Sequence, residues 1–209
     1  LGARFTKWRA VYTISNLNPT SIAISSNAHA LARYSALVQE NGMVPIVEPE
    51  VLMDGDHSAD ACLSKTSDVI QKCFEELILH KVDLSGIILK PNMILAGNKS
   101  KEKISSDEVS EKTLKCLKNS VPSEVPGIAF LSGGQSEIEA TENLNSINKK
   151  NNTNFIITYS YGRALQQGAL KLWSKNTNDI EGTQKIFNHR AKMCSLAAQG
   201  IWSSKLENK

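Results

Sequence analysis

A lysine at the end of an apolar run is the first residue whose setting points to chemistry. Lys90 follows the run Gly86–Leu89 and precedes Pro91. Burial disfavours the charged form of a lysine, and a neutral amine can attack a carbonyl carbon to form a Schiff base. A lysine in this place can also extend past the strand end into solvent. The sequence therefore offers Lys90 as a candidate nucleophile, with an ordinary surface lysine as the alternative.

Two glutamates end another predicted strand and could perform acid–base chemistry. Glu48 and Glu50 flank Pro49 directly after the apolar run Met43–Val47. Side chains two residues apart on a strand point to the same face, so the two carboxylates can lie on one side of it. Neighbouring carboxylates repel each other, so one of them holds its proton closer to neutral pH, which suits general acid–base catalysis. A solvated strand end would give the same pattern without a catalytic role.

The same two-residue spacing recurs with cations. Lys7 and Arg9 lie on either side of Trp8 in an early run of β-branched and aromatic residues. An ammonium close to Lys90 would favour the neutral amine there, because like charges repel. The two glutamates would balance the total charge of such a cluster. The pattern predicts a group of cations and carboxylates where these strand ends meet.

Two glycine-containing loops could bind an anion. Ser132, Gly133 and Gly134 follow one apolar run, and Gly162 with Arg163 follows the next. Glycines let backbone N–H groups approach an anion closely, and an arginine can hold a phosphate with two parallel hydrogen bonds. Ordinary glycine turns are the alternative for each loop. Two such loops after successive strands favour a phosphate site.

Metal and nucleotide binding have little support in the motifs. The segment Asp54–His57 reads DGDH but lacks the spacing of a calcium loop, so we expect a turn and no metal site. No phosphate-binding loop of a nucleotide-binding protein is present. The histidines on predicted helices have no histidine partner four residues away, and we expect them to be structural: His29, His80 and His189. We therefore expect neither a metal nor a cofactor.

Five β-α units follow one another along the chain. Strands are predicted over Trp8–Ile14, Met43–Val47, Gly86–Leu89, Ile128–Leu131 and Phe155–Thr158. Helices are predicted over Asn27–Asn41, Asp60–His80, Ser105–Asn119, Ser136–Lys149, Ala164–Trp173 and Ile180–Gln199. Gly42 is expected to end the first helix, and the pairs Ser105/Glu108 and Ser136/Glu139 are expected to open two others as capping boxes. One domain spanning residues 1–209 is the simplest account.

This alternation is typical of a parallel sheet covered by helices. An open doubly wound sheet and a (β/α)8 barrel both satisfy it. The barrel is favoured because polar residues recur where the strands end, and active sites of barrels lie at that face. Barrel phosphate sites follow strands seven and eight, which numbers the strands here four to eight. A full barrel takes about 250 residues, so this chain is about three units short.

Composition sets broad limits on function. Of 209 residues, 41% are hydrophobic and 22% charged, with a formal net charge of +3. That excess is too small to predict a nucleic-acid or membrane-surface partner, and no apolar run approaches the ~18 residues of a membrane span. The chain opens at Leu1 without an apolar signal, and its four scattered cysteines form no CxxC pair. We expect a cytoplasmic chain, or part of one, with reduced thiols.

With these residues placed, the chain resembles class I fructose-bisphosphate aldolase. The similarity runs in order over nearly the whole sequence, and the motifs VPIVEPE, LKPNM and LSGGQS are together highly specific. The matching segments are Lys7–Arg9, Leu31–Tyr34, Val44–Glu50, Asp54–His57, Leu89–Met93, Phe130–Ser136, Asn143–Asn145 and Ser160–Leu165.

The resemblance implies a (β/α)8 barrel enzyme of glycolysis and gluconeogenesis. Such an enzyme reversibly cleaves fructose 1,6-bisphosphate into dihydroxyacetone phosphate and glyceraldehyde 3-phosphate, without a metal, and works as a homotetramer. The resemblance implies that Lys90 forms the Schiff base, Glu48 is the acid–base group and Lys7 the neighbouring cation. It assigns Arg9 and Glu50 to the surrounding charge network. It implies that the ketose 1-phosphate is bound by the following residues: Ser132, Gly133, Gly162 and Arg163.

The chain also departs from the family pattern. The family begins well over a hundred residues earlier, so the first three barrel strands have no counterpart here. Two interpretations follow: this segment supplies the Schiff-base half of an aldolase site, or it is a non-catalytic aldolase-like paralogue that serves as a binding or assembly piece. In either case we expect residues 1–209 alone to be nearly inactive.

Overall fold

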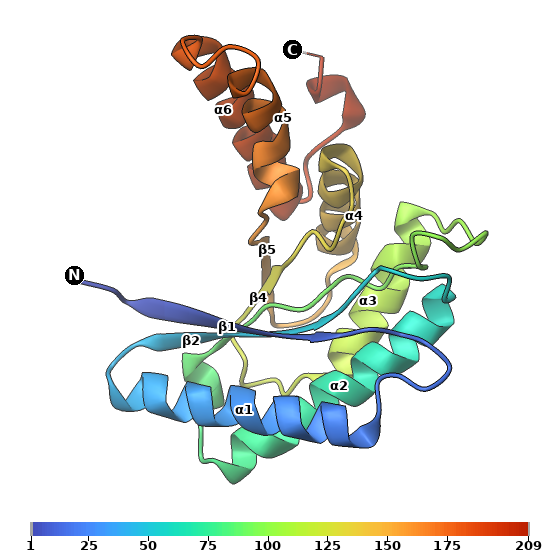
Figure 1. Ribbon diagram of the computed structural model, residues 1–209, viewed down its shortest axis with the longest axis vertical. Coiled ribbons are helices and arrows are strands. Elements are labelled where there is room, and N and C mark those ends of the chain that lie inside the picture. The colour runs from blue at the N-terminus through green and yellow to red at the C-terminus, as the bar shows by residue number, and fades with distance from the viewer. Residues whose placement is uncertain (1, 209) are drawn as a thin grey trace.

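The computed structural model describes residues 2–208, which form one parallel sheet covered by helices (Figure 1). Its five strands are β1 (Phe5–Tyr12), β2 (Val44–Val51), β3 (Ile88–Leu89), β4 (Gly127–Phe130) and β5 (Ile156–Tyr159). All neighbours pair in parallel, and the spatial order is β1-β2-β3-β4-β5. Every crossover thus returns to the adjacent strand. A doubly wound sheet reverses its order at a switch point, so the observed order is that of a barrel segment.

Six α-helices accompany the strands. They are α1 (Ser21–Glu40), α2 (Ala59–Leu79), α3 (Ser106–Ser120), α4 (Glu137–Lys150), α5 (Arg163–Trp173) and α6 (Ile180–Ala198). Figure 1 shows α1, α2 and α3 side by side along the sheet, while α5 and α6 form a pair beyond β5. Glu48 lies on the face of β2 opposite to Val47 and Val51, whose side chains belong to the hydrophobic core.

Local sequence explains where the helices begin and end. Ser105 and Ser136 each form a capping box with the glutamate three residues on, which confirms both predictions. Gly42 follows α1 with φ of 67°, a conformation that glycine adopts without steric cost. Helix α1 begins six residues before the predicted start, because Thr20 accepts a hydrogen bond from the Ala23 N–H and caps it there.

The core lies between the sheet and the helices. Its largest fully buried side chains include Leu31 and Ile70 from two helices and Leu89 and Phe130 from two strands. Full burial of one such side chain contributes about 1.5–3 kcal/mol. The helical pattern of α2 predicts five inward positions. Val69, Ile70, Phe74 and Leu77 are buried, and Leu63 is partly buried against the core. This core fixes the strands from which the polar side chains extend.

Strand β2 is longer than the sequence predicts. Expected to end at Val47, it continues to Val51 although it contains Pro45 and Pro49. The backbone groups of the odd-numbered residues of β2 point toward β3, because the Val47 carbonyl accepts a hydrogen bond from the Lys90 N–H. Pro45 and Pro49 are odd-numbered, so the N–H groups that they lack would also have faced β3. Strand β3 pairs with only two residues of β2, so the missing proline donors leave no ladder bond broken. The Val51 N–H instead donates to the side chain of Asn92 at 2.9 Å.

Helix α1 is buried on only one side. Leu31 and Val38 are buried, whereas Leu37 is largely exposed. Leu37 lies with Trp8 and Tyr34 along an open groove of about 430 Å³ beside β1. The helical periodicity was correct, but β1 is an outer strand and no described element covers this side.

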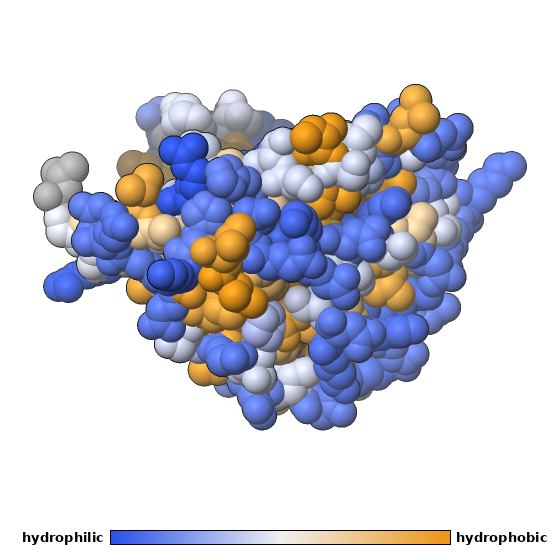
Figure 2. Space-filling view, turned by 90° about the horizontal axis from the view of Figure 1, so that it is seen from below, coloured by the Kyte–Doolittle hydropathy of each residue, from blue (hydrophilic) through white to orange (hydrophobic). Residues whose placement is uncertain are grey.

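The surface gives no sign of a membrane-spanning helix. None of the helices among residues 2–208 combines the length and hydropathy that a bilayer crossing requires. Figure 2 views the molecule from below, and hydrophilic residues predominate on that face with separate apolar patches among them.

Candidate active site

Glu48, in the second half of β2, lies between Lys7 of β1 and Lys90, the residue that follows β3. Its Oε1 is 3.1 Å from Lys90 Nζ, and its Oε2 is 3.1 Å from Lys7 Nζ. The Glu48 side chain is only 4% exposed and that of Lys90 12%, while Lys7 is 43% exposed. Lys90 therefore does not extend into solvent as a typical surface lysine does. We call these three residues the lysine–glutamate cluster.

The register of the sheet brings this cluster together. Arg9 pairs with Glu48 across β1 and β2, and Val47 pairs with Leu89 across β2 and β3. Glu48 is thus level with Lys90, the residue after β3. Lys7 lies two residues before Arg9, so the pleat directs both side chains to the face that carries Glu48. The alternation of polar positions predicted this convergence correctly.

The Glu48 carboxylate keeps an acceptor position free. Both lysine contacts are ion pairs, and Oε2 is buried without a hydrogen-bond partner among the described residues. A buried carboxylate oxygen in this state favours a further donor, such as a substrate hydroxyl or a water molecule. The arrangement can hold and move a proton next to the Lys90 amine.

Arg9 and Glu50 form a second ion pair beside the first. Arg9 Nε donates to Glu50 Oε2 at 2.5 Å. This hydrogen bond raises the pKa of Arg9, with smaller contributions from the charges of Glu50 and Glu48, and burial opposes it. Glu50 is buried, so Arg9 neutralises a carboxylate that would otherwise be costly there. The expectation that Glu48 and Glu50 share one side of the strand is met.

Asn92 is a positioning residue that the sequence reasoning did not single out. Its side chain accepts the Val51 N–H and donates to Thr66 Oγ1 at 3.1 Å and to the Met93 carbonyl at 3.1 Å. These bonds tie the end of β2, with its two glutamates, to the segment that follows Lys90. A polar residue directly after Lys90-Pro91 was the available signal.

The two glycine loops leave neighbouring strands. Phe130 pairs with Tyr159 at the ends of β4 and β5, so the loops at Ser132 and Gly162 start from adjacent positions. Ser132 is buried, Gly133 has φ of 58°, and Gly162 precedes α5 without a side-chain cap. An uncapped helix start is suited to an anion. Arg163 is the first residue of α5 and is exposed.

One open cavity contains none of the predicted site residues. It has a volume of about 500 Å³, and its lining includes Met53, residues between Leu95 and Ser106, and polar residues of α4. The chemistry of the side chains, rather than this cavity, identifies the lysine–glutamate cluster as the candidate site.

The remaining candidate motifs behave as follows. The Asp54–His57 segment, predicted as a turn, bends at Gly55 and Asp56 and accepts backbone hydrogen bonds from Gly97 and Lys99. Burial lowers the pKa of His57. The four cysteines are free and buried, and burial raises the pKa of Cys73 to about 12 and that of Cys116 to about 11. These thiols are poor nucleophiles. His29 and His80, expected to be structural, meet Glu76 between α1 and α2.

The strand order defines an α/β protein of the barrel class, and the lysine–glutamate cluster is its candidate site. A family model described as fructose-bisphosphate aldolase class-I matches residues 1–209. The chain belongs to this family, which confirms the resemblance seen in its motifs.

Individual relatives agree. The chain is 49% identical over 203 residues to a Xanthomonas campestris protein named "Probable fructose-bisphosphate aldolase class 1", covering 97% of this chain and 61% of the relative. It is 48% identical to "Fructose-bisphosphate aldolase 4, cytosolic" of Arabidopsis thaliana, covering 95% of this chain and 51% of the relative. The chain thus spans between half and two thirds of these proteins.

A solved structure supports the fold. The fructose-bisphosphate aldolase of Plasmodium falciparum, crystallised with TRAP and a small-molecule inhibitor, superposes with a TM-score of 0.94 at 42% identity. The match covers 97% of this chain and 59% of that one. The sheet described above is therefore part of an aldolase barrel.

Proposed function

We propose that this chain supplies the Schiff-base half of an aldolase site that reversibly cleaves fructose 1,6-bisphosphate to dihydroxyacetone phosphate and glyceraldehyde 3-phosphate. The observation that carries the proposal is the shielded Lys90 amine, held 3.1 Å from a buried carboxylate that also faces Lys7. Membership of the family supplies the substrate class. We further propose that residues 1–209 form part of a single barrel domain.

The first chemical step is addition of the Lys90 amine to the ketone carbon of the substrate. Attack requires the neutral amine, so Lys90 must release a proton, and Glu48 Oε1 can accept it at 3.1 Å. The nitrogen–carbon bond forms as the carbonyl π electrons move to oxygen, giving a carbinolamine. Glu48 then returns a proton to the hydroxyl, which leaves as water, and an iminium ion remains.

The iminium ion then allows the carbon–carbon bond to break. Glu48, a carboxylate again, takes the proton of the hydroxyl on the carbon that becomes the aldehyde. The electron pair of the breaking bond moves toward the cationic nitrogen, the aldehyde product departs and an enamine remains on Lys90. Protonation of the enamine and addition of water regenerate the free amine and release dihydroxyacetone phosphate. Lys7 Nζ lies 3.1 Å from Glu48 Oε2 and keeps a positive charge beside the carboxylate that carries the proton. Arg9 and Glu50 hold the surrounding charges in place.

The ketose 1-phosphate is assigned to the two glycine loops. Backbone N–H groups near Gly133 and Gly162, the hydroxyl of Ser132 and the guanidinium of Arg163 are suitable donors for a phosphate dianion. Their strands adjoin in the sheet, so one phosphate can be reached from both loops. This arrangement suits a phosphorylated sugar, and nothing in the mechanism requires a metal or nucleic acid.

Reductive trapping tests the proposal. The whole protein is incubated with dihydroxyacetone phosphate, reduced with borohydride and digested, and the modified peptide is located by mass spectrometry. We expect a secondary amine at Lys90 and none in Lys90→Ala. Lys65→Ala, which removes an exposed lysine of α2, is the matched control and should trap normally. Labelling that persists at full yield in Lys90→Ala would refute the assignment.

The chain by itself should be a poor catalyst. Strands β1 and β5 are the outer strands of the described sheet, and an unpaired parallel edge promotes association with other chains. Loss of alignment by even 1 Å can cost about 10²-fold in rate. We expect residues 1–209 expressed alone to self-associate in sedimentation and to show at most trace cleavage. A cooperative monomer with near-normal kcat would contradict this expectation.

The family also supports a setting for the whole protein. We propose a cytoplasmic homotetramer, as the family resemblance implies. Light scattering after size-exclusion chromatography and fractionation of cells test the two parts separately. A monomer in solution would refute the first part, and exclusive recovery with membranes or an organelle would refute the second.

A further inference from the structure

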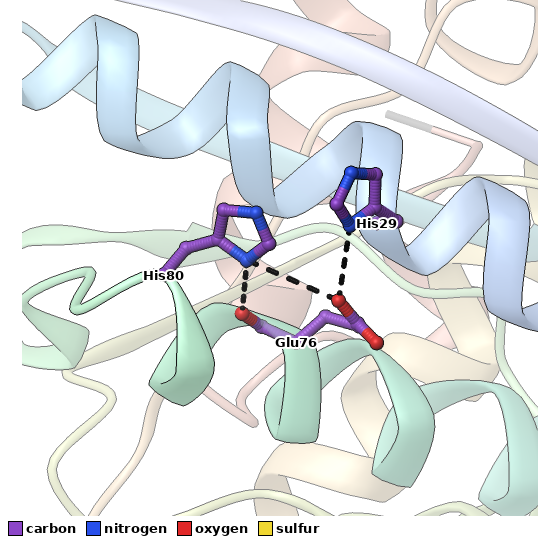
Figure 3. Close-up of side chains that lie close together, drawn as sticks. All are labelled: His29, Glu76 and His80. Carbon is purple, nitrogen blue, oxygen red and sulfur yellow. Dashed lines mark hydrogen bonds and ion pairs between the residues drawn. The ribbon is translucent and has the colours of Figure 1, made fainter.

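Three possible metal ligands meet between α1 and α2. Figure 3 shows that His29 extends from α1 toward Glu76 on α2, and that His80 reaches the same carboxylate from the end of α2. The three ligand atoms lie within 4.8 Å of one another. This is the only group of three or more such residues among those the structure describes. We call these residues the histidine cluster.

We propose that the histidine cluster binds a divalent transition metal, with Zn²⁺ the best match. Two imidazole nitrogens and one carboxylate oxygen are a recurring zinc donor set, and a water molecule would complete four-coordination. The site is separate from the proposed aldolase chemistry, since it lies in the helical layer and not at the carboxyl ends of the strands.

The distances favour this metal. Zinc binds nitrogen and oxygen at about 2.0–2.2 Å, so two tetrahedral donors lie about 3.3 Å apart. His29 Nδ1 is 3.2 Å from Glu76 Oε2, close to that separation. His80 Nδ1 is 3.9 Å from the same oxygen, so its ring must approach by about half an ångström. In doing so it gives up its 2.9 Å hydrogen bond to the Glu76 carbonyl.

The framework of the site is well built. Glu76 and His80 are four residues apart at the end of one helix, a spacing that puts both side chains on one face. His29 belongs to the neighbouring helix, and α1 and α2 pack closely along their lengths. Its ring lies edge-on to His80, with centroids 4.8 Å apart. Two ligands from one helix and one from its neighbour would let the metal link the two helices.

Charge and access also suit a cation. Glu76 supplies the one carboxylate of the cluster, and its Oε2 lies 3.2 Å from His29 Nδ1 and 3.9 Å from His80 Nδ1. Lys72 Nζ approaches the other oxygen, Oε1, at 3.5 Å and also pairs with Glu75. Oε2 thus remains for the metal. The His29 side chain is 52% exposed, and Glu76 and His80 are 13% and 21% exposed, so an ion can reach them from solvent.

Zinc titration of the whole protein tests the proposal. The protein is first treated with chelator, and binding is measured by calorimetry and by the visible absorption of Co²⁺ as a zinc substitute. We expect one equivalent to bind per chain and the melting temperature to rise, because the metal binds the folded helix pair and not the unfolded chain. The Co²⁺ spectrum should be that of a nitrogen–oxygen site without a thiolate charge-transfer band.

Variants identify the ligands. His29→Ala, His80→Ala and Glu76→Gln should each weaken binding at least about tenfold, since even changes outside the first ligand shell reach that size. His189→Ala is the matched control, because His189, on α6, also pairs with a single carboxylate, that of Glu207. The His189→Ala variant should bind zinc as the parent does. Circular dichroism confirms that each variant is folded.

Two results would overturn the inference. One is the absence of saturable zinc binding at one equivalent per chain, which would mean that the histidine cluster is only an ion pair between two helices. The other is binding that survives both histidine substitutions, or a thiolate band in the Co²⁺ spectrum, which would place the metal elsewhere. Neither result affects the trapping of dihydroxyacetone phosphate on Lys90, so failure here and failure of the proposed function are distinguishable.

Discussion

The lysine–glutamate cluster and the histidine cluster are both built around one glutamate with a basic group on either side, yet they differ in setting. Glu48 projects from a strand and is buried, and its two lysines come from β1 and from the residue that follows β3. Glu76 projects from a helix at a partly exposed junction, with one histidine from its own helix and one from the next. The first setting shields an amine for covalent chemistry, and the second leaves room for an ion from solvent.

The difference also shows what a sequence can reveal. In a parallel sheet, side chains at successive strand ends converge because the ladder fixes the register. Contacts between helices depend on how each helix is rotated about its axis, and small changes in packing angle alter which residues meet. A strand-end cluster is therefore easier to anticipate than a cluster between helices. The following predictions test this contrast, beginning with the largest effect.

Replacing the central carboxylate of the lysine–glutamate cluster should have the largest effect. Glu48→Gln removes the proton carrier and leaves the charges of Lys7 and Lys90 facing each other. We expect kcat for cleavage of fructose 1,6-bisphosphate to fall by about 10²–10⁴, the usual contribution of general acid–base catalysis. Steady-state kinetics on the whole protein measures this. Glu124→Gln, at an exposed position before β4, should keep the parent rate. A Glu48→Gln variant of comparable rate would show that the cluster is only structural.

Removing the proposed phosphate contact should have a smaller effect. Arg163→Ala removes a charged hydrogen-bond donor, so transition-state stabilisation should fall by about 1.5–3 kcal/mol, and kcat/KM should fall roughly 10- to 150-fold. Arg163→Lys should recover only part of this, because an ammonium cannot form the paired contact of a guanidinium.

Arg33→Ala, at an exposed position of α1, serves as the control for Arg163 and should be silent. The assay compares substrates with and without the 1-phosphate. Equal losses on both substrates would place Arg163 outside the phosphate site, whereas a loss confined to the phosphorylated substrate supports the assignment.

The contrast between strands and helices extends to the rest of the fold. Five strands and six helices were predictable, because apolar runs of strand length alternate with helical periodicity and two capping boxes mark helix starts. The end of β2 was not, since the predicted strand stopped at Val47, whereas Asn92 and the short β3 let it continue to Val51. Likewise, Lys90 and Glu48 were singled out by their predicted places at strand ends, and Lys7 by its two-residue spacing from Arg9.

The histidine cluster lay beyond the same reasoning. His29 precedes Glu76 by 47 residues, and no motif within either helix marks the pairing. His80 does stand four residues after Glu76, but the sequence-based expectation depended on a second histidine at that spacing and not on a carboxylate. Only the packing of α1 on α2, which the amphipathic pattern of each helix leaves undetermined, brings the third ligand into place.

The capping box at the start of α4 provides a stability control for both clusters. Ser136→Ala removes the side chain that accepts the Glu139 N–H at the start of α4. The free energy of unfolding should fall by about 1 kcal/mol, the typical value for an N-cap. Denaturant unfolding measures this change. Zinc affinity and the rate of the folded enzyme should both stay at parent values, since Ser136 contacts neither cluster. Ser123→Ala, at a serine outside the helices, should leave the unfolding free energy within about 0.5 kcal/mol of the parent.

Chelation should separate the two clusters most sharply, although its expected effect on the rate is none. The Schiff-base route uses the Lys90 amine as the electron sink and Glu48 as the proton carrier, so no step requires a metal. EDTA should therefore remove zinc from the histidine cluster, lower the melting temperature toward that of His29→Ala, and leave cleavage of fructose 1,6-bisphosphate unchanged. Atomic absorption, thermal unfolding and kinetics on the same sample measure all three. If EDTA abolished cleavage and Zn²⁺ restored it in the parent but not in His80→Ala, the clusters would be coupled. The division between a covalent site at the strand ends and a separate metal site between helices would then be wrong.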